Sequence, residues 1–234
     1  MTTGYEKTRE MLAWVASKLG ADLLQEVVFV GGCTTTFLLT DEATQEDVRH
    51  TKDVDLIVDV IGPHSWSVFK DKLRQRGFTE RMDMDAPTCA LFLDELRVDF
   101  MPDDPGILGH TNRWYGHALK TANWHEVTLG DQRFDIRIVS PLSFVATKLE
   151  AFLGRGKGDI SASHDLEDML LLFFGREELV DEILRGEPDI VEFVAGELRD
   201  LLAAPEFEWL VQSTVRGDVP SEQYLFERLE KVTG

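Results

Sequence analysis

The chain has 234 residues, 43% of them hydrophobic, which is enough for one large domain or two small ones with a buried core. Its formal net charge of −19 argues against broad, non-specific binding to nucleic acid or to an anionic membrane surface. Two cysteines, Cys33 and Cys89, are too few for a disulfide scaffold and lack the spacing of a zinc site.

The N-terminal residues lack the basic-then-apolar pattern of a signal peptide, and no apolar run reaches the ~18 residues that cross a bilayer. We therefore expect a soluble, cytoplasmic protein with no membrane partner and with reduced cysteines.

The N-terminal part of the chain predicts a helix, an apolar strand and a second helix, in that order. Residues 5–19 have apolar side chains near helical spacing, and Gly20 is expected to end that helix. Residues 27–30 predict a strand, and residues 33–40 a short helix after it. The polar, acidic segment from Thr40 to Arg49 predicts an exposed loop.

The middle of the chain alternates between apolar and polar residues, as strands do. Strand pairs are expected at 88–93 with 96–101, and at 124–129 with 133–139. Ser140-Pro141 then opens a helical pattern that continues to the C-terminus.

This order of elements predicts an α/β (α+β) fold with a mixed sheet flanked by helices and a helical region after it. We expect a catalytic α/β domain over residues 1–139 and a C-terminal helical domain over residues 140–234 that completes the active site.

The most informative segment contains Asp53 and Asp55 at positions i and i+2 of a predicted strand. Successive strand side chains point to opposite faces, so the two carboxylates share one face and Val54 and Leu56 share the other. Two neighbouring carboxylates repel each other unless a counter-charge is present. Oxygen ligands suit Mg²⁺ or Mn²⁺, so this spacing indicates a divalent metal site.

Two further features fit nucleotide chemistry. Gly31-Gly32 follows the apolar strand directly and predicts a tight turn whose backbone N–H groups can meet a phosphate. Asp99 lies in another alternating segment between Val98 and Phe100, and it offers a third carboxylate for a metal.

The ordered set of Gly31-Gly32, the run Arg49-x-Thr51-x-Asp53-x-Asp55-Leu56 and the later Asp99 resembles the polymerase-β-type nucleotidyltransferase superfamily. Within it, the chain resembles the AbiEii/MenT-like proteins, which are toxins of bacterial toxin–antitoxin and phage-defence pairs. Three later segments extend the resemblance: 148–152, 155–159 and 164–168. Together the motifs span about residues 27 to 175.

The resemblance implies a site for each part of an NTP–metal complex. Asp53, Asp55 and Asp99 would bind Mg²⁺ or Mn²⁺, and Lys148 would contact the nucleotide phosphates. The remaining nucleotide-binding positions implied by it are Gly31, Gly32, Thr51, Arg155, Lys157, Asp165 and Asp168.

The basic residues also fit phosphate binding by their own placement. Lys148 and Arg155 are seven residues apart, which is two turns on one helix face, and Lys157 follows among glycines. In so acidic a chain this group could neutralise a triphosphate.

A purely structural interpretation is open for each of these residues. Asp53, Asp55 and Asp99 could be solvated carboxylates, and Lys148 could be an ordinary surface lysine. Asp165 and Asp168, three residues apart, could be a charge pair that the dipole of a helix N-terminus favours.

The leading functional hypothesis is a metal-dependent nucleotidyltransferase that moves NMP from an NTP to RNA, such as a tRNA end, or to protein. As a toxin it would have a cognate antitoxin as partner. The enzyme alternative is transfer to a small molecule, as in antibiotic-modifying nucleotidyltransferases. The non-enzyme alternative is a module that binds a nucleotide or an antitoxin without turnover.

Overall fold

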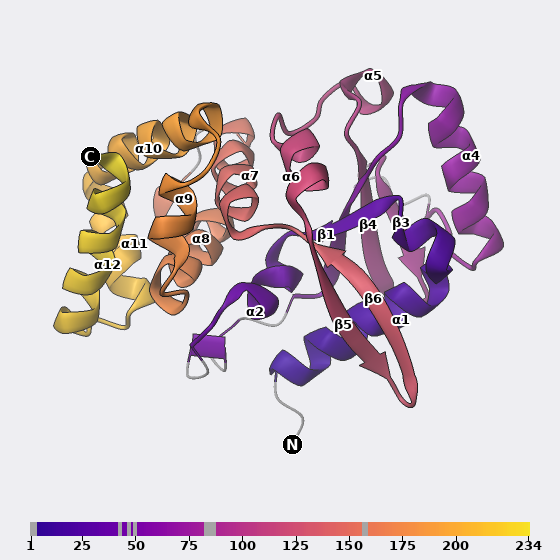
Figure 1. The fold of residues 1–234 in the computed structure, drawn as a ribbon, viewed down its shortest axis with the longest axis horizontal. Coiled ribbons are helices and arrows are strands. Elements are labelled where there is room, and N and C mark those ends of the chain that lie inside the picture. The colour runs from indigo at the N-terminus through magenta and orange to yellow at the C-terminus, as the bar shows by residue number, and fades with distance from the viewer. Residues whose placement is uncertain (1–3, 42–43, 46–47, 49–50, 82–87, 156–158) are drawn as a thin grey trace. The chain divides into compact units, whose positions relative to one another are not determined.

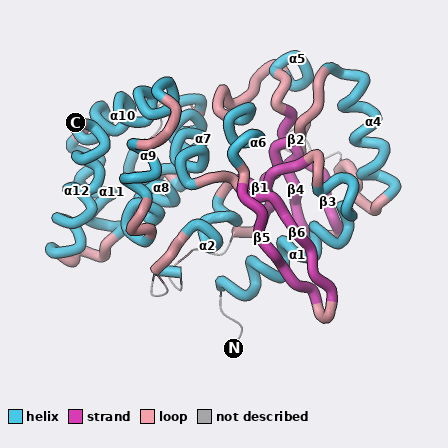
Figure 2. The backbone as a smooth tube through the Cα atoms, viewed as in Figure 1, coloured by secondary structure: helices cyan, strands magenta, loops and turns pink. Residues whose placement is uncertain are grey.

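The computed structural model of the chain describes residues 4–41, 44–45, 48, 51–81, 88–155 and 159–234 (Figures 1 and 2). The chain divides into two compact units. The first consists of residues 1–36 and 49–140, and the second of residues 37–48 and 141–234. The break between Ser140 and Pro141 is next to the boundary expected from the sequence, whereas residues 37–48 belong to the second unit and not to the first.

The first unit contains a six-stranded sheet in the order β3-β4-β2-β1-β6-β5. β2 pairs with β4, and β1 with β6, in parallel; the other pairs are antiparallel. The expected mixed sheet is therefore confirmed. The strands are β1 (Val27–Val30), β2 (Asp53–Val58), β3 (Ala90–Leu93), β4 (Leu96–Pro102), β5 (Asn123–Leu129) and β6 (Gln132–Ile138).

Helices flank this sheet. They are α1 (Gly4–Leu24), η1 (Gly32–Thr34), α4 (Gly62–Gln75), α5 (Pro105–Leu108) and α6 (Tyr115–Thr121), while α2 (Thr35–Leu38) crosses the break between the units. Gly20 ends the first helical stretch of α1, as expected, because its angles of φ 67° and ψ 167° are non-helical. A second short helical stretch follows this kink and buries Leu23 and Leu24 in the core.

An aromatic cluster holds α4 on the face of the sheet that carries the even-numbered side chains of β4. The Phe100 ring forms edge-to-face pairs with Phe69 and Phe78 at centroid distances of 5.9 and 5.4 Å, and Trp66 stacks on Phe69. Phe69, Phe78 and Phe100 are all fully buried. The odd-numbered residues of β4, which include Asp99, consequently point to the opposite face.

The second unit is helical, as the C-terminal sequence pattern predicted. Its elements are α7 (Pro141–Gly154), η2 (Ile160–Ala162), α8 (His164–Gly175), α9 (Leu179–Leu184), α10 (Pro188–Leu202), α11 (Pro205–Thr214) and α12 (Val219–Thr233). α8 packs against α7, α11 and α12, so it occupies the middle of the unit. No helix in the described ranges has both the length and the apolar character needed to cross a membrane.

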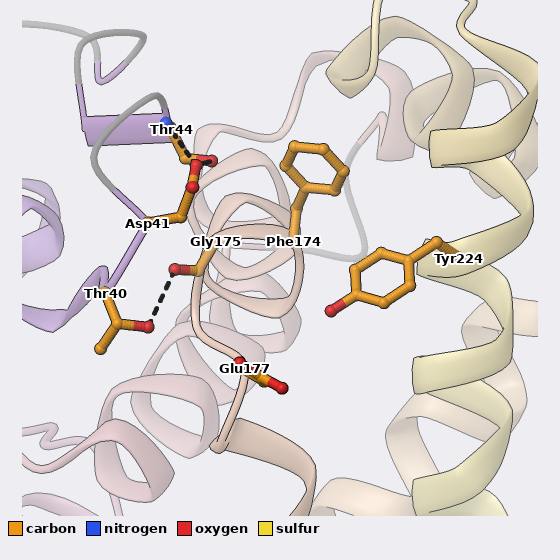
Figure 3. Close-up of a pocket in the computed structure, with 7 residues that line it drawn as sticks. All are labelled: Thr40, Asp41, Thr44, Phe174, Gly175, Glu177 and Tyr224. Atoms are coloured by element: carbon orange, nitrogen blue, oxygen red, sulfur yellow. Dashed lines mark hydrogen bonds between the residues drawn. The ribbon is translucent and has the colours of Figure 1, made fainter.

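Residues from the predicted loop after α2 dock on the end of α8 (Figure 3). The backbone N–H groups of Thr40 and Asp41 both donate to the carbonyl of Gly175 at 3.0 Å. A Cβ on Gly175 would lie 2.6 Å from the Thr44 side chain and 2.7 Å from that of Leu39, so only glycine allows this approach. The expected exposed loop is therefore wrong for Thr44, which is buried, because α8 offers an unpaired C-terminal carbonyl.

Arg228 on α12 satisfies the other carbonyls at the end of α8. Its guanidinium is buried and donates to the carbonyls of Phe173 at 2.7 Å, Arg176 at 2.6 Å and Glu177 at 3.1 Å. The carbonyl of Arg176 also accepts from the Leu179 N–H at 3.2 Å, whereas those of Phe173 and Glu177 have no other donor among the described residues, and leaving them unpaired costs free energy. Arg228 is thus a side-chain cap supplied by another helix.

Replacing Arg228 with methionine should destabilise the second unit by about 2 kcal/mol or more, because the carbonyls of Phe173 and Glu177 lose their donor. The free energy of unfolding from urea titrations measures this. Arg199→Met is the matched control, since Arg199 donates to the Thr233 carbonyl at an exposed position, and it should cost within about 0.5 kcal/mol. Equal losses in the two variants would contradict the capping role.

Candidate functional site

The register of the sheet brings the predicted aspartates together. Asp55 of β2 lies directly opposite Asp99 of β4, and Asp53 lies opposite Arg97. The four residues share one face of the sheet because they occupy alternate positions on paired strands about 4.8 Å apart. The interpretation of Asp99 as a mere surface residue is wrong, since only 7% of it is exposed.

Asp99 is held by a residue from its own strand. The Nε of Arg97 donates to Oδ1 at 2.8 Å, and Nη2 donates to Oδ2 at 2.5 Å. This hydrogen bonding raises the pKa of Arg97, although its partial burial acts in the opposite direction. Arg97 is therefore a counter-charge within the group of acids. No role was predicted for Arg97 from the sequence, but its position two residues before Asp99 places both on one strand face.

Gly31 lets the chain turn against Asp55. It has φ 72° and ψ −172°, a region that is open essentially to glycine alone. A Cβ at this position would lie 2.8 Å from Cγ of Asp55, so the side chain of any other residue would overlap the carboxylate. Gly32 then begins η1. The turn after β1 is thereby adjacent to the aspartates, as nucleotide binding by Gly31 and Gly32 would require.

A run of threonines follows this turn; the sequence predicted that a hydroxyl residue near Gly31 and Gly32 helps to hold the phosphates, without indicating which one. Thr34 donates its hydroxyl to the carbonyl of Gly31 at 2.8 Å. The hydroxyls of Thr35 and Thr36 are buried and have no hydrogen-bond partner within the described residues. A buried hydroxyl is seldom left unpaired, so these two are candidate contacts to a ligand. Thr51 instead donates to the carbonyl of Asp53 at a long 3.4 Å, which is a local contact before β2.

The second unit brings four other predicted residues together. Lys148 of α7 donates from Nζ to Asp165 at 3.2 Å and to Asp168 at 2.6 Å, both on α8. Arg155, just after α7, donates to the other oxygen of Asp165 at 2.6 Å. Lys148 is only 8% exposed, so its interpretation as a surface lysine is wrong. Lys157 lies outside the described residues.

These four residues form an ion-pair cluster with balanced charge. Asp165 is in the first turn of α8, where the helix dipole favours a negative charge, so the helix-terminus interpretation holds for it. A hollow of about 240 Å³ adjoins the cluster and is lined in part by Phe152, Arg155 and His164. Most of the Arg155 side chain is exposed there, so its guanidinium could also meet an anion.

The carboxylates of the first unit are suitable ligands for a hard cation, but their arrangement fits a metal site only in part. Asp53, Asp55 and Asp99 offer carboxylate oxygens, the ligands that Mg²⁺ and Mn²⁺ prefer. Both oxygens of Asp99, however, accept hydrogen bonds from Arg97. Within the described residues, no group of three or more His, Cys, Asp or Glu side chains is arranged to hold a metal ion. Asp53 and Asp55 are thus the first candidates, and Asp99 could join them after exchanging Arg97.

Cys89 lies near the same acids. It precedes β3, and its carbonyl accepts a hydrogen bond from the N–H of Phe100, the residue after Asp99. Burial raises the pKa of the Cys89 thiol to about 11, and the negative charges of Asp99 and Asp55 act in the same direction. Both cysteines are thiols, as expected, but Cys89 is only half-buried.

Comparisons with known proteins leave the function to be inferred from the site. No protein-family model and no curated protein sequence matches the chain. The chain is similar to the crystal structure of an antigenic nucleotidyltransferase-like protein from Paracoccidioides brasiliensis, with a TM-score of 0.47 and 17% sequence identity. That match covers 97% of this chain and 93% of the other. The specific resemblance to AbiEii/MenT-like toxins stays a prediction.

Replacing Gly31 with alanine should destabilise the first unit more than the same change at Gly130. Both glycines have positive φ, so both variants carry a backbone penalty of about 1 kcal/mol or more. Only at position 31 does the new methyl group overlap Asp55, whereas nothing lies within 4 Å at Gly130. The excess at position 31 should reach about 1–3 kcal/mol in urea unfolding. Equal losses would show that Asp55 does not press on the turn.

The alkylation of Cys89 by iodoacetamide should rise with pH around a midpoint near 11, because the thiolate is the reactive form and the folded protein raises this pKa to about 11. Asp99→Asn removes a negative charge, so the thiolate should form at lower pH and the midpoint should fall. Asp131→Asn, a charge change in the exposed β5–β6 turn, should leave it in place. Mass spectrometry identifies the alkylated cysteine. An unchanged midpoint in Asp99→Asn would contradict the coupling.

Proposed function

We propose that the chain transfers a nucleotidyl group from an NTP to an acceptor. The observation that supports this most directly is the register that sets Asp55 beside Asp99, with Asp53 on the same face and Gly31 against Asp55. A structural role gives no reason to gather acids in this way, since like charges at such spacing destabilise the sheet. Nucleotidyl transfer can use both features, because carboxylates bind the metal ions and the N–H groups of a glycine turn bind the phosphates.

In the proposed reaction an acceptor oxygen or other nucleophile attacks the α-phosphorus of the NTP. A bond forms between that atom and phosphorus, and the bond to the oxygen that bridges to the β-phosphate breaks. Pyrophosphate leaves with the electron pair of that bond. Asp99 would take the proton of the acceptor, and this requires that Arg97 release one of its oxygens.

Asp53 and Asp55, joined by Asp99, would hold Mg²⁺ or Mn²⁺. When bound, the ion would offset negative charge on the reacting phosphates. The role of the protein is to place the acids on two paired strands, whose backbones are fixed by the sheet.

Gly31, Gly32 and Thr51 would bind the nucleotide from the first unit. Lys148, Arg155, Lys157, Asp165 and Asp168 are the nucleotide-binding residues proposed for the second unit. Lys148 would contact a phosphate by exchanging one of its two carboxylate partners for a phosphate oxygen. Arg155 could contact a phosphate without giving up its bond to Asp165, because most of its side chain is exposed.

Charge bears on the acceptor. The second unit has 24 Asp and Glu against 9 Lys and Arg, and the first has 19 against 15, so the net charges are −15 and −4. Both disfavour an extended contact with RNA, so we propose a protein side chain as the first acceptor to test, with a tRNA end as the second. A toxin role with a cognate antitoxin belongs to the same proposal and predicts that induced expression slows growth.

Purified protein with Mg²⁺ and each labelled NTP should transfer label to cell protein or RNA and release pyrophosphate. Asp53→Asn and Asp55→Asn should each lower kcat/KM about a thousandfold or more, because the variants lose a metal ligand. Asp59→Asn is the matched control: it follows β2 at the same strand parity and is exposed, so activity should stay within about twofold.

Absence of transfer with every NTP and acceptor would contradict the enzyme. Calorimetry then distinguishes the remaining possibility, a nucleotide-binding module, because that module would bind an NTP tightly without releasing pyrophosphate.

A further inference from the structure

The guanidinium of Arg97 lies among the carboxylates that we propose as metal ligands. In the register of the sheet, Arg97 is opposite Asp53 and Asp99 is opposite Asp55. Paired strands are about 4.8 Å apart, and positions i and i+2 of one strand are about 6.7 Å apart. The long side chain of Arg97 therefore starts within reach of the acids of both strands.

The contact between Arg97 and Asp99 occupies both oxygens of the carboxylate. Nε donates to Oδ1 at 2.8 Å, and Nη2 donates to Oδ2 at 2.5 Å. Two parallel hydrogen bonds of this kind are the strongest geometry for a guanidinium and a carboxylate. Asp99 is almost fully buried, so salt in the solvent screens the contact only weakly. A divalent cation can therefore bind Asp99 only in competition with Arg97.

Asp53 acts on the same guanidinium. Hydrogen bonding to Asp99 is the main cause that raises the pKa of Arg97, and the negative charges of Asp99 and Asp53 add to it. Arg97 is thus positively charged and lies near acids of two different strands. It offsets part of their negative charge, and this weakens their attraction for another cation.

Arg97 can leave Asp99 without any change in the sheet. The Arg97 side chain is 37% exposed, whereas that of Asp99 is 10% exposed. The backbone of β4 is held by β2 on one side and by β3 on the other. Rotation of the side-chain torsions of Arg97 is therefore enough to turn the guanidinium towards another anion, while Asp99 stays in place.

A triphosphate is the anion that the proposed reaction brings to this face of the sheet. The turn at Gly31, which we propose as a phosphate-binding turn, is in contact with Asp55, the residue opposite Asp99. A guanidinium binds phosphate oxygens with the same paired hydrogen bonds that it makes to a carboxylate. A triphosphate also carries more negative charge than one carboxylate, so it can draw the guanidinium away from Asp99.

We propose that Arg97 makes metal binding depend on the binding of the NTP. In the free protein the guanidinium stays on Asp99 and keeps this carboxylate from divalent cations. When an NTP binds, the guanidinium moves to a phosphate, and Asp99 becomes available beside Asp53 and Asp55. This inference rests on the proposed function and adds to it an order in which the ligands bind.

Binding measurements without turnover test this order. Electron paramagnetic resonance follows the binding of Mn²⁺ in the absence of nucleotide. Calorimetry follows the binding of a non-hydrolysable NTP analogue in EDTA, so that no metal takes part. Compared with the wild type, Arg97→Met should bind Mn²⁺ about tenfold or more tightly and the metal-free analogue about tenfold or more weakly. The analogue should raise the Mn²⁺ affinity of the wild type about tenfold more than that of Arg97→Met.

Two further variants separate this contact from a general effect of charge. Arg133→Met, on β6, removes the same charge from a side chain that is 75% exposed, and it should change each affinity less than about twofold. Arg97→Lys keeps the charge but loses the planar fork, so it should hold Asp99 less firmly and bind Mn²⁺ more tightly than the wild type does. Urea unfolding verifies that each variant is folded, because Arg97→Met leaves a buried carboxylate without its partner.

The possible failures are distinguishable. If the wild type transfers a nucleotidyl group but neither Arg97→Met nor Arg97→Lys changes the Mn²⁺ affinity, the role of Arg97 is excluded and the proposed function stands. Equal effects of Arg97→Met and Arg133→Met would also exclude it, because overall charge would then explain the result. A wild-type protein that binds no Mn²⁺, with or without the analogue, would overturn this inference together with the proposed function.

Discussion

Repulsion between Asp55 and Asp99 is the constraint around which the first unit is built. The parallel pairing of β2 and β4 sets these two side chains opposite each other on one face. Arg97 meets the repulsion with a bidentate contact to Asp99, and Gly31 makes room on the other side of Asp55. The positive charge of Arg97 thus offsets part of the repulsion between the acids, and the missing side chain of Gly31 leaves space for Asp55. Such an arrangement is hard to explain as scaffold, and it is the physical basis for placing chemistry here.

The second unit depends in a similar way on one helix, α8. Residues far from it in the sequence pair with the carboxylates near its N-terminus and with the backbone carbonyls at its C-terminus. Near its N-terminus, α8 presents Asp165 and Asp168 to Lys148 of α7. At its C-terminus, the carbonyl of Gly175 accepts from Thr40 and Asp41, and Arg228 caps the carbonyls around it. Breaking any buried member of these contacts would leave a charge or a carbonyl unpaired, which is costly in a low-dielectric interior.

Local pattern predicted much of this. Alternation placed Asp53, Asp55 and Asp99 on strands, and the helical C-terminal region followed from the apolar spacing after Pro141. Contacts between residues far apart in the sequence were not predictable from it. The burial of Lys148 depends on α8, and the docking of Thr44 on a glycine more than a hundred residues later. Arg97 is the exception, because its spacing of i and i+2 to Asp99 on one strand is a local pattern that allows their contact.

The helical unit is assembled from two stretches of chain that synthesis separates. Thr40 contacts Gly175, which lies 135 positions later in the sequence. Every strand of the six-stranded sheet except β1 lies in the sequence between residues 37–48 and the helices that follow Pro141. During synthesis, residues 37–48 leave the ribosome before the helices of the second unit. They can pack against those helices only after residues 49–140 have also been synthesised. A fragment that starts at Pro141 would lack this piece and would leave the end of α8 uncovered. The two units can be named separately, but they cannot be cut apart at a single peptide bond.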